Sequence, residues 1–217
     1  MANVELFPPT CIHIFTGRSI KQRTTDNEER TTDETHQTTD VHAMKTSGKN
    51  VFITGPPRCG KSTLMEKLVA RIEKPTTGFF TQQITVKGQR VGFSITTLDG
   101  KEGTLAHVNM NGRCKVGKYT VNLQDLDQIA VPSMLPSAPG DVVVIDEVGK
   151  MECFSPIFKQ VLMRLLDSEH PVIGSIAQKG DRFIEEIKAR DDVVLFRITL
   201  ENRDTPELFS QLLAAIG

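Results

Sequence analysis

The chain has 217 residues and a formal net charge of −1, with 38% hydrophobic residues, 24% charged residues, one tyrosine and no tryptophan. This length is sufficient for one α/β domain with a complete hydrophobic core. The near-neutral charge excludes a global field that would attract nucleic acid or an anionic membrane, and the scarcity of Tyr and Trp argues against a surface that stacks nucleic-acid bases.

The cysteines and the apolar segments indicate the cellular compartment in which we expect the chain. Cys11, Cys59, Cys114 and Cys153 lie far apart and form no Cys-x-x-Cys pair, so we expect neither a zinc site nor a disulfide framework. Reduced thiols are the default in the cytoplasm, which is the expected location. No segment is long and apolar enough to span a membrane. We expect no signal peptide, because no basic region precedes an apolar core.

The first 48 residues differ in composition from the rest of the chain. The tripeptide Thr-Thr-Asp recurs every seven residues, at 24–26, 31–33 and 38–40. A coiled coil would need apolar residues at its a and d positions, but between Lys21 and His42 the only aliphatic residue is Val41. Such a segment buries too little surface to offset the entropy of ordering. We therefore predict a disordered low-complexity tail over 1–48, followed by one folded domain over 49–217.

Residues 55–62 read Gly-Pro-Pro-Arg-Cys-Gly-Lys-Ser and match every fixed position of the Walker A pattern G-x-x-x-x-G-K-[ST]. An apolar run at 51–54 precedes them and predicts a strand. A helical pattern follows, with one apolar face made of Leu64, Met65, Leu68, Val69 and Ile72. Strand, loop and helix in this order are the context in which the motif binds phosphate.

The loop predicts a nucleotide site with a defined chemistry. Its glycines let the backbone turn with N–H groups inward, and the following helix adds free N–H groups and the positive end of its dipole. Lys61 can reach the β- and γ-phosphates, and the Ser62 hydroxyl can bind Mg²⁺. The candidate nucleotide-binding residues of this segment are Gly55, Pro56, Pro57, Arg58, Cys59, Gly60, Lys61, Ser62 and Thr63.

The middle of the chain predicts mainly β-structure. Residues 79–86 and 90–98 have the pattern of two strands joined by the short turn Lys87-Gly88-Gln89, which favours an antiparallel hairpin. Residues 99–120 are glycine-rich and irregular, with one further short strand expected. Residues 122–129 predict a helix.

Residues 141–147 read Asp-Val-Val-Val-Ile-Asp-Glu, an apolar β-branched run that ends in two acids. The run predicts a strand buried on both faces, as in a parallel sheet, and ligands bind at the carboxyl ends of such strands. Asp146 is therefore a candidate Mg²⁺ ligand, together with Ser62, and Glu147 is the candidate base that activates a water. A strand that merely meets solvent could also end in acids, but the Walker A loop in the same chain favours the functional interpretation.

The remaining elements alternate between helix and strand. Ser155-Pro156 predicts a helix start, 171–177 a strand, 181–190 a helix, 193–199 a strand, and 204–206 the start of a last helix. The sum is an α/β fold of the P-loop NTPase type, with a mostly parallel sheet, helices on both faces and a small antiparallel hairpin.

Two residues after the last predicted strand are candidates for contact with the nucleobase. The Arg203 guanidinium can stack on a base, and the Asn202 amide can bond to a base edge. For Asn202 the alternative is a cap in front of the C-terminal helix.

Several segments resemble a small family of nucleoside-triphosphatases from thermophiles and animals. The most specific is the extended Walker B segment Asp-Glu-Val-Gly-Lys-Met-Glu at 146–152. The others are Gly-Phe-Phe-Thr at 78–81, Arg-Val-Gly-Phe at 90–93, Leu-Asp-Gly at 98–100, Gly-Lys-Tyr at 117–119, Val121, Gly-Ser-Ile-Ala at 174–177 and Glu-Asn-Arg-Asp at 201–204. The resemblance covers residues 49–205. It implies a RecA-like P-loop fold and slow hydrolysis of several nucleoside triphosphates, with broad tolerance of the base.

Hydrolysis of this kind needs charge stabilisation and a placed water more than covalent chemistry, so Lys61 and Glu147 are the candidate catalytic residues. Lys150 can either turn back toward the γ-phosphate or remain a solvated loop lysine. No arginine finger can be assigned from the sequence. Arg113 and Arg182 are candidates only because they lie in glycine-adjacent loops.

Two other functions remain open. A nucleotide or polynucleotide kinase would use the same loop, but residues 87–118 hold only Arg90 and Arg113, which is few for an arginine-rich lid, and Glu147 directly after Asp146 favours water as the acceptor. A nucleotide-gated interaction switch would also turn over slowly, and the sequence does not separate it from an enzyme. In each case the expected ligands are nucleoside triphosphates with Mg²⁺, and the chain is expected to be a monomer.

Overall fold

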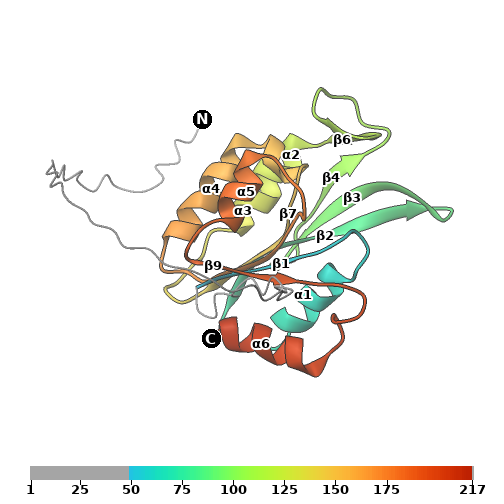
Figure 1. Cartoon of the computed structure of the whole chain (residues 1–217). Coiled ribbons are helices and arrows are strands. Elements are labelled where there is room, and N and C mark those ends of the chain that lie inside the picture. Colours follow the sequence, from blue (N-terminus) through green and yellow to red (C-terminus); the bar gives the residue numbers. More distant parts are fainter. Residues whose placement is uncertain (1–48, 217) are drawn as a thin grey trace, which may run out of the picture. The chain divides into compact units, whose positions relative to one another are not determined.

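The computed structural model of the protein describes residues 49–216, and the tail predicted at 1–48 lies outside the described residues. The described part contains one mixed sheet with helices packed on both of its faces (Figure 1). Its strands are β1 (Asn50–Thr54), β2 (Thr76–Val86), β3 (Gln89–Thr97), β4 (Glu102–His107), β5 (Lys115–Val116), β6 (Tyr119–Val121), β7 (Val142–Val148), β8 (Val172–Ile176) and β9 (Val193–Arg197).

The sheet joins a parallel half to an antiparallel half, in the order β5-β6-β4-β3-β2-β7-β8-β1-β9. From β2 to β9 all neighbouring strands are parallel, and from β2 to β5 all are antiparallel. The strand β2 belongs to both halves, because residues 76–80 pair with β7 and residues 79–86 pair with β3. The carboxyl ends of β1 and β7 lie at the same edge of the sheet, separated by β8, where ligands bind in such folds.

The helical segments lie in two layers. Their bounds are α1 (Lys61–Val69), α2 (Leu123–Asp125), η1 (Leu126–Ala130), α3 (Val131–Ser133), η2 (Glu152–Phe154), α4 (Pro156–Asp167), α5 (Arg182–Lys188) and α6 (Pro206–Ile216). Figure 1 shows α1 and α6 on one face of the sheet and the segments from α2 to α5 on the other.

Two hydrophobic cores, one on each face, hold these layers together. Successive residues of β7 alternate between them: Val142 and Val144 pack with α1 and α6, whereas Val143 and Ile145 pack with α4 and its neighbours. All four side chains are fully buried, and burial of each contributes about 1.5–3 kcal/mol. The strand predicted at 141–147 is therefore apolar at every position because both of its faces meet a core.

Polar side chains set the starts of two helices that cover the sheet. Ser155 Oγ accepts a hydrogen bond from Phe158 N at 3.0 Å, and Asp181 Oδ1 accepts one from Ile184 N at 3.1 Å. Each bond satisfies an N–H group that a helix leaves free in its first turn. The predicted starts of α4 and α5 are confirmed.

The antiparallel half is larger than the small hairpin that was expected. Residues 99–120 contribute three strands instead of one, and these extend the predicted hairpin to a five-stranded antiparallel run. The three strands are short and are separated by glycine-containing turns, so their sequence lacks a long alternating pattern.

Two helix ends also differ from the sequence-based expectations. The helical segment that begins after Asn122 continues to Ser133, beyond the predicted end at 129. The helix α1 ends at Val69, so the prediction that Ile72 belongs to it is wrong. Ile72 N bonds to the Val69 carbonyl at 3.2 Å, which continues the chain as a tighter turn and keeps the Ile72 side chain against the core.

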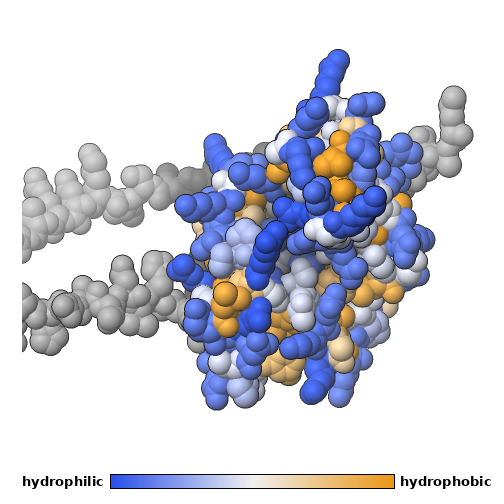
Figure 2. Space-filling view, turned by 90° about the vertical axis from the view of Figure 1, so that its right-hand side faces the viewer, coloured by the Kyte–Doolittle hydropathy of each residue, from blue (hydrophilic) through white to orange (hydrophobic). Residues whose placement is uncertain are grey.

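The surface shown in Figure 2 is mainly hydrophilic, with hydrophobic side chains in separate patches. Among the described residues, the large hydrophobic side chains that are exposed are Val86, Phe154, Ile157 and Leu200. A few exposed hydrophobic side chains of this kind need no binding partner. None of the helices in residues 49–216 is long and apolar enough to cross a membrane.

We expect Gly78→Ala to destabilise the fold much more than Gly88→Ala. Both glycines have positive φ, +121° and +77°, but a Cβ at Gly78 would lie 1.9 Å from the Val144 carbonyl oxygen in β7, whereas a Cβ at Gly88 would meet nothing within 4 Å. Strained backbone alone costs about 1–2 kcal/mol, and overpacking adds about 1–3 kcal/mol. Urea denaturation of both variants measures the difference, and equal losses of unfolding free energy would contradict it.

Candidate active site

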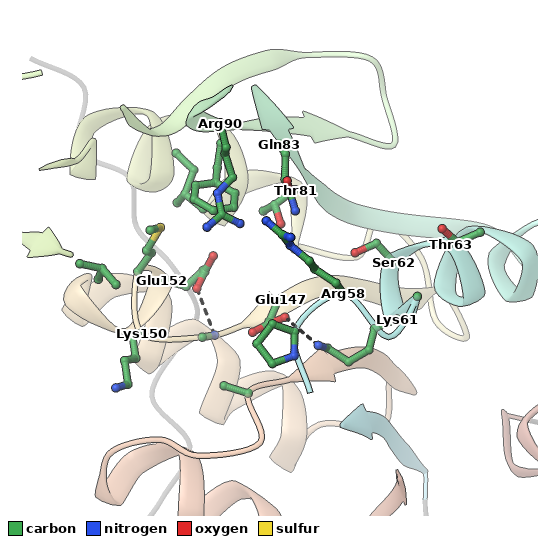
Figure 3. Close-up of a pocket in the computed structure, with 18 of the residues that line it drawn as sticks. Arg58, Lys61, Ser62, Thr63, Thr81, Gln83, Arg90, Glu147, Lys150 and Glu152 are labelled. Carbon is green, nitrogen blue, oxygen red and sulfur yellow. Dashed lines mark hydrogen bonds and ion pairs between the residues drawn. The ribbon is translucent and has the colours of Figure 1, made fainter. Parts of the chain in front are cut away.

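A cavity of about 730 Å³ lies where the phosphate loop, the end of β7 and the antiparallel strands meet (Figure 3). We call it the central cavity. The loop and the start of α1 contribute Pro57, Arg58, Gly60, Lys61, Ser62 and Thr63. The segment that follows the buried part of β7 contributes Glu147, Gly149, Lys150, Met151 and Glu152. The antiparallel strands and their connections contribute Thr81, Gln83, Arg90, Phe93, Leu105 and Val116, and the loops after β8 and β9 contribute Ala177, Lys179 and Arg203.

The phosphate loop connects β1 to α1 and rests on the core below it. A Cβ on Gly55 would lie 2.2 Å from the Ile198 carbonyl oxygen, so only glycine fits beneath the end of β9. The Cys59 side chain is buried and packs in the core with α1 and α6. Cys59 therefore supports the loop from below, and only its backbone is available to a ligand. Pro56 is exposed and does not line the cavity.

Lys61 lies at the mouth of the loop and faces the acid at the end of β7. Its ammonium group donates to the Gly55 carbonyl at 3.3 Å and lies 3.7 Å from Glu147 Oε2. The Lys61 side chain is 10% exposed and that of Glu147 is 34% exposed. Burial raises the pKa of Glu147, and the positive charge of Lys61 acts in the opposite direction.

Asp146 is buried beneath the cavity. Its Oδ1 accepts a hydrogen bond from the Ser175 hydroxyl on β8, while its Oδ2 is buried and has no partner among the described residues. Burial raises the pKa of Asp146, and the nearby hydroxyl groups of Ser175 and Ser62 act to lower it. The structure thus brings the two predicted metal ligands, Ser62 and Asp146, together.

Glu152 is a third acid of the site, which the sequence indicated only as the last residue of the extended Walker B segment. It is 3% exposed, lines the cavity and accepts a hydrogen bond from Gly149 N at 3.0 Å. Burial raises the pKa of Glu152 to about 8, and the negative charge of Glu147 adds to this effect. A third acid so close to the end of a buried strand was the available signal, but its burial depends on the tertiary fold.

The two residues predicted for base contact are placed differently. Arg203 lines the cavity beside the loop, and its Nη1 donates to the Cys59 carbonyl at 3.4 Å. Asn202 does not line the cavity. Its Oδ1 accepts from Thr199 N at 2.8 Å and its Nδ2 donates to the Arg197 carbonyl at 2.9 Å. The Asn202 amide therefore closes the turn after β9. It does not cap the C-terminal helix either, because the first-turn N–H of Leu208 in α6 is bound by Thr205 Oγ1 at 3.4 Å.

The basic residues differ in whether they line the central cavity, and the sequence did not predict which of them do. Lys150 is exposed and lines the cavity, whereas Arg113 and Arg182 do not line it. The Arg182 side chain is 92% exposed and pairs with Glu186 at 2.6 Å. Arg90 lines the cavity instead. Its position depends on a contact with Tyr119 of β6, on the other side of β4, and not on its neighbours in the sequence.

The chain matches a family model described as NTPase over residues 50–213. Nucleoside-triphosphatase THEP1 of Thermotoga sp. (strain RQ2) is 41% identical over 167 residues, which cover 76% of this chain and 94% of that protein. The human cancer-related nucleoside-triphosphatase is 39% identical over 173 residues, which cover 72% of this chain and 91% of that protein.

Comparison of the fold with solved structures leads to the same family. The crystal structure of THEP1 from the hyperthermophile Aquifex aeolicus matches with a TM-score of 0.70 at 31% identity, over 77% of this chain and 98% of that chain. The predicted P-loop fold class and the predicted family are confirmed: this chain is a member of the NTPase family.

Proposed function

We propose that this chain hydrolyses nucleoside triphosphates to nucleoside diphosphates and phosphate. The observation that carries the proposal is the position of Glu147, which lies 3.7 Å from Lys61 and lines the same cavity as the phosphate loop. Membership of the NTPase family and the names of the relatives, nucleoside-triphosphatases, support the same reaction.

In this proposal the phosphate chain binds along the loop and the first turn of α1. Backbone N–H groups and the positive end of the helix dipole stabilise the phosphate oxygens. Lys61 adds a full positive charge near the β- and γ-phosphates. Arg203, beside the loop, stacks on the base, whereas Asn202 shapes the turn that positions Arg203.

The residues present fit a Mg²⁺ ion. Asp146 Oδ2 is a buried oxygen without a hydrogen-bond partner, and the Ser62 hydroxyl is the second candidate ligand. No group of three or more His, Cys, Asp or Glu residues that could hold a metal occurs within residues 49–216. This suits Mg²⁺, which binds through one or two protein ligands together with waters and phosphates. When bound, the ion neutralises phosphate charge.

Glu147 is the proposed base. As the water oxygen forms its bond to the γ-phosphorus, the bond from that phosphorus to the β–γ bridging oxygen breaks, and Glu147 accepts the proton of the water. Burial raises the pKa of Glu147, which makes the carboxylate a better proton acceptor, and Lys61 helps to keep it ionised. The products are nucleoside diphosphate and phosphate.

The alternative reactions have a direct test. Purified protein is incubated with nucleoside triphosphate and Mg²⁺, alone or with nucleosides, nucleotides or 5′-hydroxyl oligonucleotides. Phosphate release without an acceptor supports hydrolysis, whereas phosphoryl transfer that requires an acceptor would support a kinase and contradict the proposal. The expected monomeric state and cytoplasmic location stay predictions.

Glu147→Gln is expected to retain triphosphate affinity and to lower kcat by about 10²-fold or more, the range for loss of a general base. Lys61→Ala is expected to weaken binding itself, because Lys61 contacts the phosphates. Titration with a fluorescent triphosphate analogue separates binding from turnover. Normal turnover in Glu147→Gln would show that another residue activates the water.

We expect weak discrimination between bases. A pocket that selects one base needs buried polar groups matched to its edge, whereas a stacking guanidinium accepts any base. Values of kcat/KM for ATP, GTP, CTP and UTP should therefore differ by about tenfold or less, and Arg203→Ala should weaken all four together. A preference of more than about a hundredfold for one base would contradict this prediction.

We expect the protonation of Glu152 to make the stability of the fold depend on pH. Its pKa rises from about 4.5 to about 8 on folding, so between these values the folded chain holds a proton that the unfolded chain has lost. The unfolding free energy attributable to Glu152 therefore falls as pH rises, by at most about 1.4 kcal/mol per pH unit. Glu152→Gln should lose less stability than the wild type between pH 5.5 and 8 without nucleotide.

Urea denaturation at both pH values measures this difference. Glu207→Gln, at an exposed acid of α6, is the control and should follow the wild type. Parallel stability curves for Glu152→Gln and the wild type would show that Glu152 is not protonated in the folded chain.

A further inference from the structure

Arg90 enters the central cavity from β3, on the wall opposite the phosphate loop. Figure 3 shows its guanidinium group directed into the cavity, with Arg58 extending toward it from the loop side. Arg90 therefore reaches the same space as Lys61 and Glu147, but from the antiparallel half of the sheet.

Aromatic side chains hold Arg90 in this position. Its Cζ atom lies 5.1 Å from the centroid of the Phe93 ring and 5.6 Å from that of the Tyr119 ring. Its Nε donates a hydrogen bond to the Tyr119 hydroxyl at 2.9 Å. The two rings contact each other edge to face at 5.3 Å between centroids, and Tyr119 is 7% exposed. The guanidinium is thus oriented before any ligand binds.

No acidic side chain within residues 49–216 pairs with the positive charge of Arg90. No described residue pairs with it or accepts a hydrogen bond from its terminal amino groups, since its side chain donates only from Nε. Six cationic side chains but only two acidic ones line the central cavity. The cations are Arg58, Lys61, Arg90, Lys150, Lys179 and Arg203, and the acids are Glu147 and Glu152. Glu147 lies beside Lys61, and Glu152 accepts from the backbone of Gly149. The charge on Arg90 is therefore available to an anion.

We infer that Arg90 stabilises, from within the same chain, the negative charge on the transferred phosphoryl group. The inference rests on the proposed hydrolysis and adds a catalytic residue to it. The loop and Lys61 contact the phosphate chain from one side, and Arg90 supplies a cation on the opposite wall. Arg90 forms no bond and takes no proton in the step, because the water proton passes to Glu147.

The surroundings make this charge effective. Phe93, Leu105 and Val116 give the Arg90 side of the cavity apolar walls, where water screens charges less than it does in bulk solvent. A cation already fixed in such a place needs no reorganisation as charge develops on the phosphoryl oxygens. Arg90 therefore takes the role that the sequence left unassigned between Arg113 and Arg182.

The first experiment compares Arg90→Ala with a matched control. We expect kcat to fall by about 10²-fold or more, as on loss of a preorganised donor or an arginine finger. The dissociation constant of a non-hydrolysable triphosphate analogue should change by less than about threefold. Arg182→Ala removes an equally charged side chain outside the cavity and should leave kcat unchanged.

The second experiment does not depend on turnover. Nucleoside diphosphate with Mg²⁺ and aluminium fluoride mimics the phosphoryl group in transit, and beryllium fluoride mimics the bound triphosphate. We expect the wild type to capture both complexes and Arg90→Ala to capture only the beryllium fluoride complex. Added guanidinium ion should restore part of the lost kcat in Arg90→Ala, which would not occur if Arg90 only supported the fold.

Arg90→Met keeps an unbranched side chain next to the two rings. It replaces Arg90→Ala in these experiments if Arg90→Ala unfolds at a lower temperature than the wild type. Capture of aluminium fluoride at the wild-type level by the folded variant, or a kcat within about threefold of the wild type, would overturn the inference. If the wild type released no phosphate from any triphosphate, the proposed hydrolysis would be wrong, and aluminium fluoride capture would still decide the role of Arg90.

Discussion

The site depends on a carboxyl group that the fold buries without pairing both of its oxygens. Asp146 is 1% exposed, and one of its oxygens has no partner among the described residues. Removing a charge from water costs several kcal/mol unless an opposite charge compensates it. The two hydrophobic cores that enclose β7 supply the stability that offsets this cost. The sheet thus presents an unpaired carboxyl oxygen that can bind a cation.

The strand β2 explains how one cavity receives groups from two kinds of sheet. Its first residues pair with β7 in the parallel half and its later residues pair with β3 in the antiparallel half. The phosphate loop and Glu147 come from the parallel half, whereas Arg90 comes from the antiparallel half. Because β2 is continuous, these groups keep a defined relative position, and the cavity is a product of the whole sheet.

Sequence motifs correctly predicted the elements whose structure depends on residues close in the sequence. The phosphate loop, the β7 strand and the caps at Ser155 and Asp181 each involve residues close in sequence, and the structure places them as predicted. Arg90 could not be found in this way, because it depends on Tyr119, which lies 29 residues away. Glu152 is likewise one acid among many in the sequence, and only the tertiary fold buries it.

Each wall of the cavity rests on a different core. Cys59, beneath the phosphate loop, packs with α1 and α6, whereas Tyr119, beneath the opposite wall, packs with the core on the other face. A ligand that contacts both walls therefore links the two cores. A ligand that binds only the folded state adds about 2.7 kcal/mol of stability at a hundredfold excess over its Kd. A triphosphate bound between the two walls would thus stabilise both cores at once.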